Sequence, residues 1–193
     1  SGAPGDAPAV GEVARRKGLF LLEDCAQCVG GAIGGRSTGT FGDMAIFSFQ
    51  MNKNMTAGEG GMLTSNDVGF AERARSFCNQ GRRIGENFFY HYTLATNCRI
   101  SALQAAVLLA QLERLPEQIC LRERNERLLR SELADIPGLR FQQAHRQVNV
   151  HSHYLLLGRI DEREFGMTRD EFYRAITAEG VPCTPFYTHP LYG

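Results

Sequence analysis

The stretch Phe47–Gly61 reads Phe-Ser-Phe-Gln-Met-Asn-Lys-Asn-Met-Thr-Ala-Gly-Glu-Gly-Gly and holds Lys53, one of only two lysines in the chain. The apolar run Ala45–Phe49 predicts a strand, and the residues after it predict a polar, glycine-rich loop. An α/β protein commonly places its chemistry in such a loop at the carboxyl end of a strand. A lysine amine can lose its proton and form a Schiff base, whereas arginine cannot. Lys53 is therefore either a reactive amine or a solvated loop charge.

The composition is that of an ordinary globular protein of 193 residues, with 43% apolar residues, 22% charged residues and a net charge of zero. A balanced charge argues against nucleic acid or an anionic membrane surface as a partner. No apolar run approaches ~18 residues, and the first residues lack the apolar core of a signal peptide. The six cysteines lie mostly in apolar or helical patterns, which suits reduced thiols in a cytoplasmic protein.

The first quarter of the chain has the pattern of half a βαβ unit. After a loop at residues 1–9, Ala9–Lys17 predicts a short helix. The apolar run Leu19–Leu22 then predicts a buried parallel strand that ends at Glu23 and Asp24. An acid at this position often caps a helix or faces solvent, but it can also face a ligand above the sheet. Both readings of Asp24 stay open at this point.

Loops and helices alternate in the middle of the chain. Gly30–Gly42 carries six glycines and is predicted to be irregular, and Gln80–Asn97 is predicted to be a long surface or interface loop. Pro116 is expected to restart or kink the longest helix. The apolar stripe of that helix is predicted at Leu103, Val107, Leu108 and Leu112. Three elements are predicted here: a strand at Met62–Thr64, a helix from Asn66 or Asp67 to about Cys78, and a long helix at Ser101–Leu133.

Pro137 and Gly138 form the clearest break, so we expect one domain at residues 1–136 and a second at residues 137–193. The second domain is predicted to contain three elements. They are a strand at Ser152–Ile160, a helix from Thr168 to Glu179 with a capping box closed by Glu171, and an extended segment at Val181–Tyr187.

Two further pairs of residues could carry chemistry. Cys25 and Cys28 have the spacing of a thioredoxin-type redox pair. A single pair without nearby histidine is poor evidence for zinc, and Asp24 would raise rather than lower a thiol pKa, so we expect neither redox chemistry nor a metal site. Asn97 and Arg99 precede the long helix, where they either contact an anion or merely supply loop polarity.

Taken together, several segments resemble one family of enzymes. The sequence is similar to the DegT/DnrJ/EryC1/StrS-type sugar and cyclitol aminotransferases, which use pyridoxal phosphate, and within them to the branch of inosose aminotransferases and aminohydroxybenzoate synthase. The resemblance covers nearly the whole chain, in order. Its segments are Glu23-Asp24-Cys25-Ala26-Gln27, Gly39-x-Phe41-Gly42-Asp43, Phe47–Gly61, Asn97-x-Arg99-Ile100-Ser101-x-Leu103-Gln104-Ala105-Ala106, Gln111-Leu112-x-x-Leu115, Ser152-His153-Tyr154 and Glu179-Gly180-Val181-Pro182.

The resemblance implies an incomplete type I fold of pyridoxal-phosphate-dependent transferases. This α/β fold would comprise part of the large-domain sheet and the long linking helix in residues 1–136, and part of an α+β small domain in residues 137–193. In the family, a phosphate-binding loop and an aromatic residue that stacks on the pyridine ring come from a segment before the first residue of this chain. We therefore expect a chain shortened at its N-terminus, and at its C-terminus just after Pro190-Leu191-Tyr192.

The resemblance also implies a role for five residues. Lys53 would form a Schiff base with pyridoxal phosphate and then move the proton during amino transfer. Asp24 would pair with the pyridinium nitrogen, and Gln27 would lie near the phenolic oxygen of the ring. Ser48 would bind the phosphate. Asn97 would reach the phosphate of the cofactor in a neighbouring subunit.

The implied reaction moves an amino group from glutamine or glutamate to a keto-sugar or keto-cyclitol. A homo-oligomer, most simply a dimer, is expected to cover the sheet edge near residues 19–22 and 45–49, because an open edge favours aggregation. The alternative is a non-catalytic remnant that binds no cofactor and acts as an oligomeric or interaction module.

Overall fold

The computed structural model describes residues 1–185, and these fall into two compact units. The first unit comprises Ser1–Arg124 together with Ala144–Leu155, and the second comprises Asn125–Gln143 and the residues from Leu156 onward. This division differs from the single boundary expected after residue 136, because residues 148–150 pair with a strand of the first unit. The end of the extended segment predicted at 181–187 lies outside the described residues.

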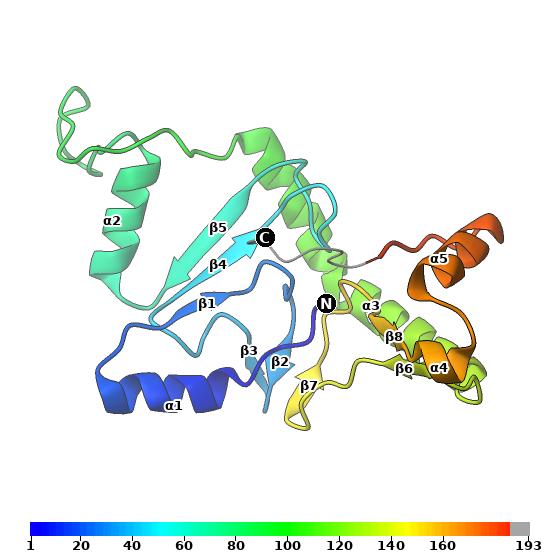
Figure 1. Ribbon diagram of the computed structural model, residues 1–193. Helices are drawn as coiled ribbons and strands as arrows, with labels where there is room; N and C mark the ends of the chain where they lie inside the picture. Colours follow the sequence, from blue (N-terminus) through cyan, green and yellow to red (C-terminus); the bar gives the residue numbers. More distant parts are fainter. Residues whose placement is uncertain (186–193) are drawn as a thin grey trace. The chain divides into compact units, whose positions relative to one another are not determined.

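The main sheet of the first unit has the order β1-β4-β5 (Figure 1). Strand β4 is parallel to β1 and antiparallel to β5. The strands predicted at 45–49 and 62–64 are confirmed, each within a residue or two. The open edge was expected near residues 19–22 and 45–49, but β4 is the central strand, so the edges of this sheet are β1 and β5. The strands are β1 (Leu22–Asp24), β4 (Met44–Ser48) and β5 (Gly61–Ser65).

The first strand begins later than its apolar pattern predicts. Leu19 and Phe20 are exposed, not buried. The backbone of Leu21 is held by Asp43, whose carboxylate Oδ2 accepts the Leu21 N–H at 2.7 Å and whose own N–H donates to the Leu21 carbonyl at 2.9 Å. The chain therefore enters regular pairing with β4 only at Leu22.

The glycine-rich segment predicted to be irregular contains a small hairpin. Gly34 and Gly35 connect its two strands with φ values of 56° and 80°. Two consecutive residues at positive φ form the kind of tight turn that matches the twist of a hairpin. The hairpin joins a later strand in a second sheet of order β3-β2-β7. These strands are β2 (Ala32–Ile33), β3 (Arg36–Ser37) and β7 (Val148–Val150).

Two helices of the first unit begin at aspartate caps. Helix α1 (Ala7–Lys17) starts two residues before the predicted helix, because the Asp6 carboxylate accepts the N–H of Ala9. Helix α2 (Val68–Cys78) begins after Asp67, whose carboxylate accepts the N–H of Phe70 at 2.7 Å. The predicted helix through Cys78 is thus confirmed, with Asp67 as its cap.

The longest helix, α3 (Ala102–Glu132), runs through Pro116 without a break, so the predicted restart does not occur. Its buried residues are Leu108, Leu115 and Ile119. Three of the four positions predicted to form its apolar stripe are exposed: Leu103, Val107 and Leu112. The buried positions of α3 form one cluster with Phe49, which precedes the loop that carries Lys53, and with Met55 in that loop.

Among its described residues, the second unit holds the end of α3, a two-stranded antiparallel sheet and two short helices. The strand predicted at 152–160 is wrong except for its end, where only the last three residues pair. The capping box predicted at Thr168 and Glu171 is confirmed. The elements are β6 (Leu139–Phe141), β8 (Gly158–Ile160), α4 (Glu162–Phe165) and α5 (Arg169–Ala178). Of the helices that the structure describes, none has the length and apolar content needed to cross a bilayer.

Candidate functional site

Asp24 and Ser48 end two neighbouring parallel strands, so the structure places both at the same edge of the main sheet. Asp24 lies opposite Ile46 in the register, and Ser48 follows two residues later. Asp24 is exposed, and its Oδ1 accepts the N–H of Ala26 at 3.0 Å. The Asp24 carboxylate therefore caps the turn after β1 from an exposed position at the sheet edge.

Glu23, the residue beside Asp24, has a structural role that the sequence did not reveal. Its carboxylate is 8% exposed and accepts backbone N–H groups from Gly39 at 2.9 Å, Phe41 at 2.6 Å and Gly42 at 2.7 Å. Three donors satisfy this buried charge. They also attach the glycine-rich segment to the end of β1, beside Asp24.

The loop with Lys53 is closed by its own backbone. Phe49 donates its N–H to the carbonyl of Gly60 at 2.8 Å, and Ala57 donates to the carbonyl of Phe49 at 2.9 Å. Within the loop, the N–H of Lys53 donates to the carbonyl of Gln50 at 2.9 Å. The lysine side chain is half-buried. The loop thus holds Lys53 on a fixed turn directly after the strand that ends at Ser48.

Two glutamines of α3 fasten the second half of this loop. Gln111 forms a pair of hydrogen bonds with the backbone of Thr56, accepting its N–H at 3.0 Å and donating to its carbonyl at 2.7 Å. Gln104 donates to the carbonyl of Glu59 at 2.8 Å. The two side chains are seven residues apart, which places them on the same face of the helix. Both belong to the segments of the resemblance, but nothing in their spacing indicates the contact with the loop.

Residues 152–154 connect the lysine loop to Gln27. Ser152 is fully buried, and its hydroxyl donates to the carbonyls of Gln27 and Gly2, both at 3.1 Å. Its own carbonyl accepts a hydrogen bond from the side chain of Asn54, the neighbour of Lys53, at 2.6 Å. The Nζ of Lys53 lies 4.6 Å from the centre of the Tyr154 ring.

This connection joins residues about 100 positions apart, so a spacing pattern could not have revealed it. The side-chain oxygen of Gln27 accepts a hydrogen bond from the amine of Ser1 at 2.5 Å. Gln27 and Lys53 are therefore brought to the same region through the segment that contains Ser152.

Asn97 lies apart from this group, in the loop between α2 and α3. It forms a bridge with Asn79, and its Oδ1 accepts the N–H of Arg99 at 3.3 Å. Arg99 in turn donates to the side chain of Asn79 at 2.8 Å. Within residues 1–185, no hydrogen bond links Asn97 to the other four predicted site residues. This agrees with the expectation that Asn97 serves a neighbouring subunit, but it does not test it.

The cysteine pair is unsuited to redox chemistry. Cys25 and Cys28 are 3% and 7% exposed. Burial, with smaller contributions from Glu23 and Cys28, raises the pKa of the Cys25 thiol to about 12, and burial also raises the pKa of Cys28. A reactive thiol needs a lowered pKa and access to solvent. In the part of the chain that the structure describes, no three His, Cys, Asp or Glu side chains are grouped as a metal site.

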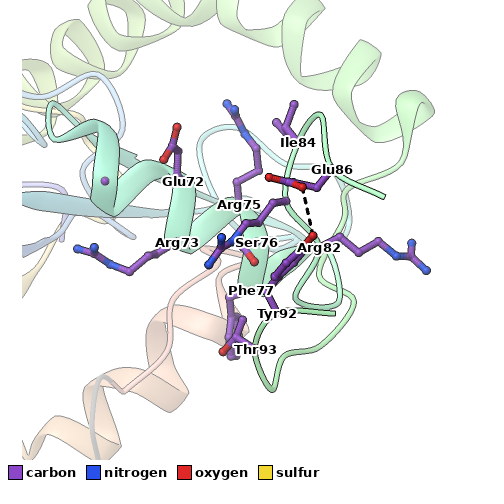
Figure 2. A pocket seen from close by; sticks show the side chains of 12 residues that line it. Glu72, Arg73, Arg75, Ser76, Phe77, Arg82, Ile84, Glu86, Tyr92 and Thr93 are labelled. Carbon is purple, nitrogen blue, oxygen red and sulfur yellow. Dashed lines mark hydrogen bonds between the residues drawn. The ribbon is translucent and has the colours of Figure 1, made fainter. Parts of the chain in front are cut away.

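Two hollows of the first unit differ in character. One, of about 230 Å³, lies beside Asp24 and is lined by residues of the N-terminal segment and by both buried cysteines. A larger one, of about 910 Å³, is formed by α2 and the loop that follows it, including Arg75, Arg82 and Tyr92 (Figure 2). None of the five predicted site residues lines the larger hollow, so we place the candidate site at the sheet edge.

The whole chain, residues 1–193, matches the sequence profile of the DegT/DnrJ/EryC1/StrS aminotransferase family. The chain belongs to this family. It is 37% identical over 180 residues to a GDP-perosamine synthase of Vibrio cholerae, an alignment that covers 91% of this chain and 48% of that protein. It is 35% identical over 207 residues to an L-glutamine:2-deoxy-scyllo-inosose aminotransferase of Streptoalloteichus tenebrarius, covering 98% of this chain and 47% of that one.

Solved structures with the same fold cover nearly the whole of this chain. The aminotransferase TlmJ of Streptoalloteichus hindustanus superimposes with a TM-score of 0.86 at 32% identity, over 96% of this chain and 50% of that one. The structure of 3-amino-5-hydroxybenzoic acid synthase gives a TM-score of 0.84 at 32% identity, over 94% and 47%. The predicted type I fold of pyridoxal-phosphate-dependent transferases is confirmed, and the chain spans about half the length of the relatives it matches.

Proposed function

We propose that this chain is part of an aminotransferase that uses pyridoxal phosphate to move an amino group from glutamine or glutamate to a keto-sugar or keto-cyclitol. The observation that carries the proposal is the arrangement at the sheet edge, where Asp24 and Ser48 end adjacent parallel strands and Lys53 follows on a closed loop. Family membership supports the reaction class.

The residues present fit the chemical groups of this cofactor. A primary amine, a carboxylate, a hydroxyl and an amide oxygen complement an aldehyde, a protonated ring nitrogen, a phosphate and a ring hydroxyl, respectively. In this proposal, Lys53, Asp24, Ser48 and Gln27 would supply these groups. Gly58 and Gly60 in the same loop leave the backbone free to approach an anion closely.

When bound, pyridoxal phosphate supplies an aldehyde and a ring that accepts electrons. The protein supplies orientation and proton transfer. The Asp24 carboxylate would keep a proton on the ring nitrogen by placing a negative charge beside it. The hydroxyl of Ser48 would donate a hydrogen bond to the phosphate. The amine of Lys53 would hold the aldehyde and then accept and return a proton as general acid and base.

The substrate class is proposed from the names of the relatives. One is a GDP-perosamine synthase and another an L-glutamine:2-deoxy-scyllo-inosose aminotransferase, which names glutamine as its amino donor. The first name refers to a sugar nucleotide and the second to a cyclitol. Glutamine is therefore the first donor to test, and the acceptor is proposed only as a keto-sugar or keto-cyclitol.

A homo-oligomer is proposed as the working form. The loop between α2 and α3 presents several large apolar side chains to solvent, among them Phe89 at 83% exposure and Leu94 at 97%. Asn97 lies in the same loop and points to the same conclusion, because the resemblance gives it a role in a neighbouring subunit. A loop of this kind is suited to a protein–protein contact.

The test is a visible absorbance titration of the purified chain with pyridoxal phosphate, followed by borohydride reduction and peptide mapping. We expect saturable binding and a reduced, stable attachment of the cofactor to Lys53. Lys53→Ala should abolish the attachment, whereas Lys17→Ala should leave it unchanged, since Lys17 is the only other lysine.

A different outcome would favour the alternative function. If the chain unfolds cooperatively but binds no pyridoxal phosphate, or if reduction labels Lys17 and the N-terminal amine as much as Lys53, it keeps the shape of the family without its chemistry. The non-catalytic interaction module would then be the better description.

A further inference from the structure

Tyr154 is the side chain whose contact with Lys53 neither the sequence patterns nor the predicted site residues account for. Its ring centre lies 4.6 Å from the lysine Nζ, and both side chains are half-buried. An ammonium group over the face of an aromatic ring is attracted by the negative charge density of that face. Partial burial strengthens such an attraction because less water competes for the charge.

One buried residue sets the position of both partners. Ser152 accepts the side-chain N–H of Asn54 at 2.6 Å, and Asn54 directly follows Lys53. Tyr154 lies only two residues after Ser152. The hydrogen bond between Asn54 and Ser152 therefore fixes the distance between the backbone next to Lys53 and the backbone next to Tyr154, which brings the amine and the ring together.

Ser152 itself is held firmly. Its N–H and its hydroxyl both donate to the carbonyl of Gly2, at 3.0 and 3.1 Å, and the hydroxyl also reaches the carbonyl of Gln27 at 3.1 Å. Its surroundings exclude water completely, since no part of it is exposed. Such a fully satisfied buried network keeps a single geometry.

We propose that Tyr154 is a positioning residue for Lys53. The face of the Tyr154 ring holds the Lys53 ammonium group beside the sheet edge, so that the amine is oriented before any ligand arrives. This inference rests on the proposed function only for the use to which the amine is put. The contact itself is a property of the chain without ligand. Ordering a flexible side chain in advance lowers the entropy cost of the reaction in which it takes part.

The test compares the reactivity of the two lysines in the absence of pyridoxal phosphate. The chain is treated briefly with acetic anhydride, which reacts with neutral amines, and the labelling of Lys53 is divided by that of exposed Lys17. Tyr154→Leu removes the aromatic face at similar size, so the ratio should rise roughly two- to fivefold. Tyr154→Phe keeps the face and should leave the ratio as it is in the unchanged chain.

The outcomes separate this proposal from the proposed function. An unchanged ratio in a folded Tyr154→Leu variant overturns the positioning role, as does an equal rise in Tyr154→Phe. Tyr154→Met provides a second non-aromatic variant should the leucine variant fail to fold, with circular dichroism as the check. If the unchanged chain fixes no pyridoxal phosphate on Lys53 after borohydride reduction, the proposed function fails while the labelling ratio still decides the role of Tyr154.

A second readout concerns the reaction itself. In a chain that does fix pyridoxal phosphate, the amine must meet an aldehyde that is already bound. The lost orientation in Tyr154→Leu should therefore slow the borohydride-trapped attachment at saturating cofactor, although the freed amine reacts faster with dissolved acetic anhydride, and Tyr154→Phe should restore the attachment. A variant that merely loosened the fold would be recognised by its circular dichroism, because Lys17 is already exposed and its labelling does not report on the fold. Slower attachment of the cofactor to Lys53 in a folded leucine variant, with rescue by phenylalanine, supports positioning through the ring.

Discussion

The two cysteines that follow β1 in the sequence are shielded from reaction by their surroundings. Cys25 and Cys28 share the spacing of a redox pair, but both are buried and burial raises the pKa of each thiol. Because the thiolate is the reactive form, a raised pKa protects a cysteine from oxidation and alkylation. The two thiols therefore behave as small apolar side chains that fill the space beside Asp24.

This gives a prediction for thiol titration at pH 8 in the native chain. The exposed cysteines, Cys98, Cys120 and Cys183, should react quickly with a disulfide reagent, whereas Cys25 and Cys28 should react only after denaturation. Peptide mapping after timed alkylation identifies each thiol. Rapid reaction of either buried cysteine in a folded sample would contradict the structure and reopen the redox alternative.

The same thiols set a direction for the dependence of stability on pH. The pKa of Cys25 is 9.0 in an unperturbed chain and about 12 in the folded one. Above pH 9 the unfolded chain releases this proton first, so the free energy of unfolding falls as pH rises from about 9 toward 12. Cys25→Ala should reduce that part of the fall in urea titrations at pH 8 and pH 10.

At the scale of single elements, α3 positions the lysine loop through two side-chain amides. Gln111 bonds both backbone groups of Thr56, so replacing it leaves a donor and an acceptor without their partner. We expect Gln111→Ala to lower the free energy of unfolding by roughly 1–3 kcal/mol. The same change should also reduce the attachment of pyridoxal phosphate to Lys53, because Lys53 lies three residues before Thr56 in the loop.

A matched control separates the loop effect from helix propensity. Gln118→Ala makes the same change on the same helix, about two turns after Gln111 and outside the contact with Thr56. Urea unfolding and hydrogen exchange of the loop amides provide the readouts. If both variants lose equal stability and the Thr56 amide keeps its protection in Gln111→Ala, the amide contact does not hold the loop.

The elements also show what the sequence could predict. Local sequence patterns were sufficient where a feature depends on residues close together in the sequence. These features are strands β4 and β5, the cap of α2 at Asp67 and the capping box at Thr168. The buried face of α3 was predicted wrongly because Phe49 and Met55, not the amphipathic pattern, determine which of its residues are covered. Strands β2 and β7 pair across more than 110 residues, which no local pattern reveals.

The candidate site follows the same rule. Asp24 and Lys53 were singled out because each follows an apolar run in the sequence, whereas the roles proposed for Asp24, Ser48 and Lys53 come from the family resemblance. The partners that hold them were missed, since Glu23 was seen only as part of an acidic pair and Tyr154 only as part of a family motif. Their contacts cross 16 to 101 residues of sequence and arise from tertiary folding alone.

At the scale of the whole molecule, two of the places where the first unit exposes apolar side chains bear on assembly. One is the edge strand β1, where Leu22 is 49% exposed, and the other is the loop between α2 and α3. Large exposed apolar groups on a soluble protein mark a contact surface or a liability for aggregation. Backbone hydrogen bonds such as Cys98 N–H to Cys78 carbonyl at 2.9 Å give the loop a defined base. An ordered loop with exposed aromatic residues fits a specific contact better than random association.

We therefore expect the chain to sediment as a dimer or higher oligomer at micromolar concentration, and the paired change Phe89→Ser and Leu94→Ser to shift it toward monomer. Removing two large apolar groups from a contact should weaken association by a factor of at least ~10, because each buried side chain of this size contributes about 1.5–3 kcal/mol. Leu128→Ser, an exposed leucine on α3, is the control and should leave the oligomer intact. Sedimentation velocity over a range of concentrations measures all three. A monomer at every concentration would remove the shared-subunit role of Asn97, because that residue would then have no neighbouring site to reach.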